Sequence, residues 1–277
     1  MDRQLSGWAC VLLLGGLIMW PAVVAAADCT TAECHQGMAG QKVHPGDMDC
    51  ESCHKAPAGT HPGGGKVGID GMCTSCHTIA EKVAHPHAPV AAGDCTVCHD
   101  PHRDTPNLLR ASEAELCLSC HAGITGPDTA ERHGPIREGA CSPCHQAHGS
   151  DNSGLLTQPF PDELFVGYDD KAYALCFSCH DRNLLRFPDT SFATGFRDGE
   201  RNLHYLHVNK TKRGRSCRLC HMAHASAQPK LMAETVNFGN WALPLNFRKT
   251  ETGGSCAPGC HREASYDRNS GAKVEPK

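Results

Sequence analysis

The chain has 277 residues, including 19 cysteines, 19 histidines, 28 glycines and 18 prolines, and only 5% of its residues are aromatic. Its formal net charge of −4 at pH 7 gives no basis for nucleic-acid binding. Beyond residue 27, no stretch approaches the roughly 20 apolar residues that a membrane-spanning helix requires.

The first segment, residues 1–27, has the pattern of a secretory signal peptide. Arg3 stands near the start, an apolar run covers residues 8–24, and three alanines at 25–27 form a cleavage site. An uncleaved membrane anchor is the alternative interpretation. Cleavage before Asp28 would remove Cys10 and leave an exported protein that does not span a membrane.

The other 18 cysteines form nine pairs, and each pair is followed directly by a histidine. Seven pairs have C-x-x-C-H spacing, whereas the first is C-x4-C-H and the last is C-x3-C-H. The cysteines are Cys29, Cys34, Cys50, Cys53, Cys73, Cys76, Cys95, Cys98, Cys117, Cys120, Cys141, Cys144, Cys176, Cys179, Cys217, Cys220, Cys256 and Cys260. The histidines are His35, His54, His77, His99, His121, His145, His180, His221 and His261.

C-x-x-C-H is the attachment signature of c-type haem. On one helical turn, positions i, i+3 and i+4 share a face, so two thiols can reach the vinyl groups while the imidazole reaches the iron. Zinc knuckles and disulfide frameworks also use paired cysteines, but neither requires a histidine after every second cysteine. The pattern predicts nine covalently bound c-type haems, each with its motif histidine as proximal ligand.

Ten histidines lie outside the motifs, close to the number of distal ligands that nine irons need. We therefore expect bis-histidine ligation, with Met38 as the one alternative ligand near the first motif. His204 and His207 compete for one position, which we assign to His207. The predicted distal ligands are His44, His61, His85, His87, His102, His133, His148, His207 and His224.

A repeat begins at His87. Each unit has a leading histidine, a C-x-x-C-H-x-x-H motif and then a second motif, and the units cover 87–121, 133–180 and 207–261. Residues 28–86 form a three-haem segment before them. We expect each leading histidine to ligate the first haem of its unit, and the histidine of C-H-x-x-H to ligate the second. On this scheme His102 serves the haem at Cys117.

The repeated motif resembles the doubled-CXXCH multihaem cytochromes, relatives of the class III (cytochrome c3- and c7-like) proteins. The resemblance covers the chain from His87 onward well and residues 29–85 more loosely. It implies electron transfer in the periplasm, or at the outer membrane or cell exterior, in anaerobic respiration. The implied partners are quinol-oxidising or outer-membrane cytochromes.

The expected fold is mostly irregular with short α-helices, wrapped around a haem core with little or no β-sheet. A capping box at Ser112–Glu115 predicts a helix start before Cys117. Further helices are expected at 78–83 and 171–176. Apolar inserts at 155–173, 184–196 and 231–247 should cover haem edges, although 241–247 is also a candidate docking surface.

Three functions are compatible with these motifs. An electron carrier is favoured, because ten spare histidines leave no iron with an open position. A multihaem reductase would need one such iron, and a subunit of a cytochrome filament or outer-membrane conduit would need an assembly surface. We expect one basic cluster either to pair with haem propionates or to dock a partner; it comprises Lys210, Lys212, Arg213, Arg215 and Arg218.

Overall fold

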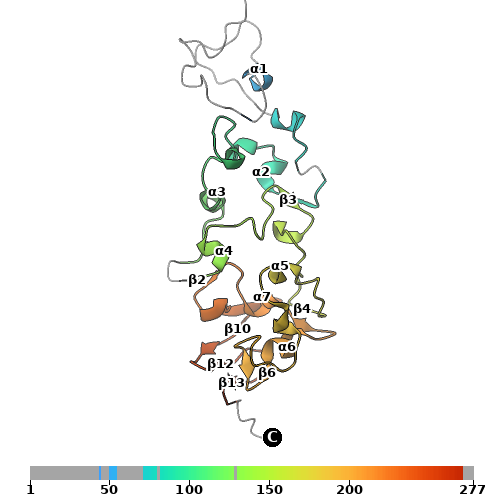
Figure 1. Ribbon diagram of the computed structural model, residues 1–277, viewed down its shortest axis with the longest axis vertical. Coiled ribbons are helices and arrows are strands. Elements are labelled where there is room, and N and C mark those ends of the chain that lie inside the picture. The colour runs from blue at the N-terminus through green and yellow to red at the C-terminus, as the bar shows by residue number, and fades with distance from the viewer. Residues whose placement is uncertain (1–43, 45–49, 55–70, 80–81, 128–129, 271–277) are drawn as a thin grey trace, which may run out of the picture. The chain divides into compact units, whose positions relative to one another are not determined.

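A computed structural model describes residues 44, 50–54, 71–79, 82–127 and 130–270 (Figure 1). All of them belong to one compact unit. The predicted signal peptide, the Cys29–His35 motif and His61 lie outside the described residues.

The helices of the described residues are short, and the longest of them, α3, has eight residues. The α-helices are α1 (Cys50–Cys53), α2 (Ala88–Ala91), α3 (Glu113–Cys120), α4 (Gly134–Arg137), α5 (Ala174–Phe177), α6 (Leu203–Val208) and α7 (Cys217–Cys220). The 3-10 helices are η2 (Cys73–Ser75), η3 (Cys95–Val97), η4 (Pro106–Leu108), η5 (Ser153–Leu155), η6 (Arg182–Leu185) and η7 (Pro229–Leu231). Among the described residues, no helix is long and apolar enough to cross a membrane.

The strands contain two to four residues each and pair antiparallel in sheets of two or three. They are β1 (His85–Pro86), β2 (Glu131–Arg132), β3 (Gly149–Ser150), β4 (Phe165–Val166), β5 (Arg197–Asp198), β6 (Arg201–Asn202), β7 (Gly214–Arg215), β8 (Ala225–Ser226), β9 (Thr235–Phe238), β10 (Trp241–Pro244), β11 (Arg248–Lys249), β12 (Gly253–Cys256) and β13 (Ala264–Asp267). The sequence predicts little or no sheet. Long loops need partners for their backbone polar groups, and these short ladders provide some of them.

Helix α3 begins where the capping box predicted. The Ser112 hydroxyl accepts a hydrogen bond from the Glu115 N–H, and the Glu115 carboxylate accepts one from the Ser112 N–H. The helix expected at 78–83 is wrong, because the described residues of that stretch are not helical. At the third site Asp169 accepts from the Lys171 N–H in a turn, and the helix begins later, at Ala174.

Neighbouring repeat units are joined by strand pairs. Strand β1, just before His87, pairs with β3, which follows the second C-H-x-x-H motif. Strand β2, just before His133, pairs with β8, which follows the third. The start of each of the first two units therefore lies against the C-H-x-x-H segment of the next unit.

Within the described part of the chain, the buried apolar side chains all come from residue 173 onward. They form two small clusters. One contains Leu219, Met232, Ala233, Val236 and Leu245, and the other contains Tyr173, Leu185 and Val208. Several of these residues belong to the apolar inserts, so the inserts supply much of the core that is built from side chains. A haem core for the rest of the fold stays a prediction.

Candidate functional site: paired imidazoles at the Cys-Cys-His motifs

The seven C-x-x-C-H motifs share one local structure. In each, the backbone N–H of the histidine donates to the carbonyl of the first cysteine at 2.8–3.0 Å, which closes a helical turn. The predicted turn is thus confirmed at every strict motif. The stretched motif at Cys256 differs, because the His261 N–H donates to the Pro258 carbonyl at 3.2 Å. None of the motif cysteines in the described ranges forms a disulfide.

Each strict motif histidine faces a histidine from outside the motifs. The pairs, with distances between ring centroids, are His44 and His77 (5.5 Å), His54 and His102 (5.8 Å), His99 and His148 (5.8 Å), His87 and His121 (6.1 Å), His145 and His224 (6.0 Å), His133 and His180 (6.0 Å), and His204 and His221 (6.4 Å).

These separations fit an iron with two imidazole ligands. With metal–nitrogen bonds of about 2 Å and about 1 Å from each nitrogen to its ring centre, two rings on opposite sides of one metal lie about 6 Å apart. Six pairs have ring planes 5° to 32° apart. The His44 and His77 rings are edge-on at 63°, with their Nε2 atoms 3.3 Å apart, so this pair is closer than the others.

Backbone carbonyls hold several of these rings through Nδ1. The acceptors are the carbonyls of Asn107 for His99 (2.8 Å), Gly154 for His145 (2.9 Å), Lys230 for His221 (3.0 Å) and Ala147 for His87 (2.8 Å). A carbonyl can only accept, so Nδ1 carries the hydrogen and Nε2 keeps its lone pair. This is the second-shell arrangement typical of metal-ligating histidines.

Three of those acceptors belong to a repeated turn that sequence reasoning missed. After each C-H-x-x-H, two consecutive residues adopt positive φ: 107–108, 154–155 and 230–231. The first residue of each turn offers its carbonyl to the motif histidine eight or nine positions earlier. A recurring Leu-Leu or Leu-Met dipeptide, at 108–109, 155–156 and 231–232, marks the turn in the sequence and could have revealed it.

Within the repeat units, the expected pairing of distal histidines with particular motifs is wrong. His87 faces His121, in the second motif of its unit, rather than the first. His148 faces His99, in the preceding unit, and His102 faces His54.

The strand pairs explain this arrangement. Pairing of β1 with β3 brings the His87 N–H to the His148 carbonyl, at 3.1 Å. His133 and His224 are joined in the same way, at 2.9 Å. Two neighbouring histidines thus face the two motifs of one unit: His87 belongs to that unit, and His148 belongs to the next.

His204 and His207 do not compete for one position. His204 faces His221, and burial together with His221 and His207 lowers the pKa of its ring to about 4. Burial also lowers the pKa of His207, with His261 among the nearby groups that contribute. A lowered pKa favours the neutral form of both rings, which is the form in which imidazole ligates a metal.

The cysteines of successive motifs lie next to one another. Burial and then the nearby Cys141 thiol raise the pKa of Cys117 to about 11, and burial with Cys256 raises that of Cys220 to about 11. A hydrogen bond to Cys176 and burial raise the pKa of Cys217. Cys73 likewise lies near Cys95, and Cys144 lies near Cys179.

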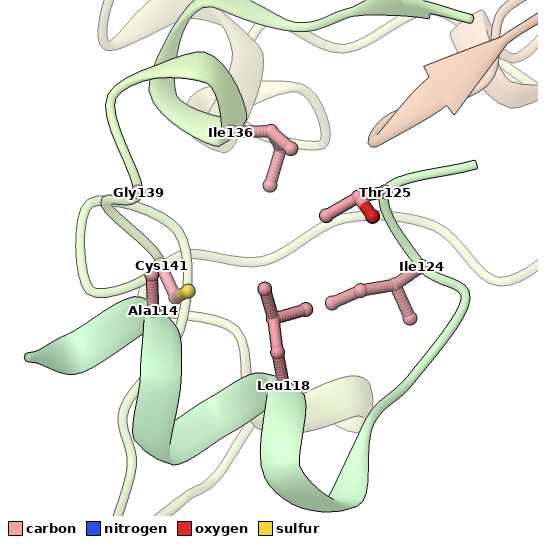
Figure 2. Close-up of a pocket in the computed structure, with 7 residues that line it drawn as sticks. All are labelled: Ala114, Leu118, Ile124, Thr125, Ile136, Gly139 and Cys141. Carbon is pink, nitrogen blue, oxygen red and sulfur yellow. The ribbon is translucent and has the colours of Figure 1, made fainter. Parts of the chain in front are cut away.

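A small apolar pocket lies beside Cys141, between α3 and the segment around α4 (Figure 2). Figure 2 shows the side chains of Leu118, Ile124 and Ile136 pointing into it. Ala114, Thr125 and Gly139 complete the lining. Apolar walls next to an attachment cysteine are the surroundings that the edge of a covalently bound porphyrin needs.

One predicted distal ligand is not placed beside a motif. His85 is exposed in strand β1, opposite Ser150, and faces no motif histidine among the residues that the structure describes. Glu113 was missed by sequence reasoning: its Oε1 accepts the N–H groups of Cys141 (2.9 Å) and Ser142 (2.5 Å), so helix α3 holds the start of the next motif.

Comparison with known proteins identifies the repeat. Residues 87–126 and 133–184 match the family described as the doubled CXXCH motif. These stretches contain the first two repeat units and their C-H-x-x-H segments. No curated protein matches the chain.

Proposed function

We propose that this chain, a doubled-CXXCH multihaem c-type cytochrome, is an exported nine-haem electron carrier in which two histidines ligate each iron. The family match supports covalently bound c-type haem and a role in electron transfer. The number of haems, the export and a place in anaerobic respiration belong to the proposal.

The proposal depends mainly on one observation: the imidazole rings of motif histidines face the rings of histidines outside the motifs. At six of the seven strict motifs, a second imidazole stands at about the distance that an intervening iron requires. A bound haem supplies an iron that takes up and releases one electron. The paired histidines would hold the iron from both sides, which would favour electron transfer over substrate binding.

The order of the motifs supports transfer along the chain. Cysteines of consecutive motifs adjoin, as Cys117 does with Cys141 and Cys176 with Cys217. Attachment through neighbouring cysteines would keep consecutive haems close. Electrons would then pass from one end of the described repeats to the other without diffusion of a carrier.

Two grounds support export. Residues 1–27 have the pattern of a signal peptide, and c-type haem is attached outside the bacterial cytoplasm. The proposed location is the periplasm, with the outer membrane or the cell exterior as the alternative. Redox proteins, such as quinol-oxidising or outer-membrane cytochromes, are the proposed partners. The basic cluster at residues 210–218 is largely exposed and suits an acidic partner or haem propionates.

Intact mass measurement of the secreted protein tests the proposal. The expected mass is that of residues 28–277 with nine haems, and a Cys256→Ser/Cys260→Ser variant should weigh one haem less. Carbon monoxide titration of the reduced protein is the second arm, and almost no binding is expected. Stoichiometric binding to the wild type would favour the reductase alternative. Sizing of the native protein distinguishes a free carrier from a filament or conduit subunit.

A further inference from the structure

We propose that helix α6 supplies the distal ligands of two different irons, with His204 serving the Cys217/Cys220 motif and His207 the Cys256/Cys260 motif. Phe196 is the positioning residue that holds both rings. This inference rests on the proposed haem function and assigns distal ligands to the last two Cys-Cys-His motifs of the chain.

The spacing on α6 allows two neighbouring metal sites. Residues three apart lie on the same side of a helix, about one turn along. The His204 ring lies 6.4 Å from the His221 ring with the planes 27° apart, as in the other facing pairs. His221 is held in turn through Nδ1 by the Lys230 carbonyl. The Cys217/Cys220 motif therefore has both of its axial histidines.

A separate set of contacts links His207 to the strand that carries Cys256. Its Nδ1–H donates to the Leu203 carbonyl at 2.7 Å, which leaves Nε2 for a metal. Phe196 stacks on the His207 ring at 5.8 Å and meets Tyr266 edge-on at 4.9 Å. Tyr266 lies in β13, which pairs with β12, the strand that ends at Cys256.

Phe196 contacts both proposed ligands. Its ring is stacked on His207 with the planes 19° apart and lies edge-on to His204 at 5.1 Å. The Thr194 hydroxyl lies 2.9 Å from Nδ1 of His204, so the same short segment fixes that ring by a hydrogen bond as well.

Helix α6 itself is fixed by a buried N-cap residue. Asn202 is 0% exposed, and its side-chain oxygen accepts from the Tyr205 N–H. Its amide donates to the carbonyls of Leu184 and Phe187. The helix that carries both histidines is thus anchored to η6 and the loop after it, which restricts the positions of both rings.

Ligand-deletion variants of the full-length haem-loaded protein test the assignment. His204→Ala and His207→Ala should each create a single carbon monoxide site in the reduced protein, and the double variant should create two. Tyr205→Phe, on the same helix, is the matched control and should create none. The assignment is overturned if either histidine variant keeps all its haems and its wild-type circular dichroism yet binds no carbon monoxide.

A result against the proposed function can be distinguished from a result against this ligand assignment. In that case the wild-type protein itself would lack haems by mass or would bind carbon monoxide at one or more irons. If His204→Ala does not accumulate, His204→Met keeps a ligand and should convert a single haem to a histidine–methionine spectrum with a higher potential. The absence of that change in a fully loaded protein also counts against the assignment.

The role of Phe196 has its own readout. Phe196→Ala should change the electron paramagnetic resonance g-anisotropy of two haems, because two imidazole planes lose their support, while the haem count stays the same. Phe196→Tyr should restore the wild-type spectrum. A change in one haem only, or in thermal stability only, would refute its role as a shared positioning residue.

Discussion

Replacement of His148 by alanine distinguishes the ligand pairing of the structure from the one that the repeat pattern predicts. The rings of His148 and His99 lie 5.8 Å apart, so the structure assigns His148 to the Cys95/Cys98 haem. The repeat pattern would assign it to the Cys176/Cys179 haem. An alanine methyl group cannot span the gap, so one iron of the proposed nine, about a ninth of the low-spin signal, should lose its sixth ligand.

The assay compares carbon monoxide binding in two backgrounds. One lacks the Cys95/Cys98 haem and the other lacks the Cys176/Cys179 haem, through serine at both cysteines, with the haem count checked by mass. If the structural pairing is right, His148→Ala adds a carbon monoxide site in the second background and none in the first. A new site in the first background, and none in the second, would refute the pairing.

Three further variants test the framework around the sites. Gly149→Ala should disturb the β1–β3 junction and the histidines beside it, because residue 149 has a φ of +151° and an added Cβ would come within 2.7 Å of the Val83 side chain. Absorption spectra of the haem-loaded protein should then show new high-spin haem. A wild-type spectrum would contradict this. Glu113→Ala removes the acceptor for the Cys141 N–H and should cost about 1–3 kcal/mol in local stability. Hydrogen exchange around Cys141 measures that loss, with Glu113→Gln expected to retain part of the protection. Asn202→Ala removes an N-cap and two donors in a fully buried position and should cost about 2–4 kcal/mol. Denaturant titration followed by tryptophan fluorescence measures it, and an unchanged midpoint would contradict the role given to Asn202.

Local sequence rules predicted the local structure well where the interactions span one turn. The capping box at Ser112 and Glu115 marks the start of α3, since both hydrogen bonds join residues three apart. The same reasoning was weaker for the other two helices. Asp169 makes a turn with Lys171 first, and only afterwards does the chain become helical at Ala174.

The family model matches the first two of the three expected repeat units, and the expected repeat was incomplete as a structure. It did not include the positive-φ turn at 107–108 and its two counterparts, whose carbonyls orient the motif histidines. Nor did it include Glu113, which contacts a motif 28 residues later. Both depend on how the backbone folds back after each motif, and spacing alone does not specify that.

The sequence by itself determined the chemistry of the motifs. A Cys-x-x-Cys-His turn closes through a hydrogen bond between residues four apart, so its geometry follows from the spacing alone. Tertiary structure decided which distal histidine faces which motif. His87 and His148 are 61 residues apart, and only the pairing of β1 with β3 brings them together. Because many loop closures of similar entropy were available to ten free histidines, their number could indicate bis-histidine ligation but not the partners.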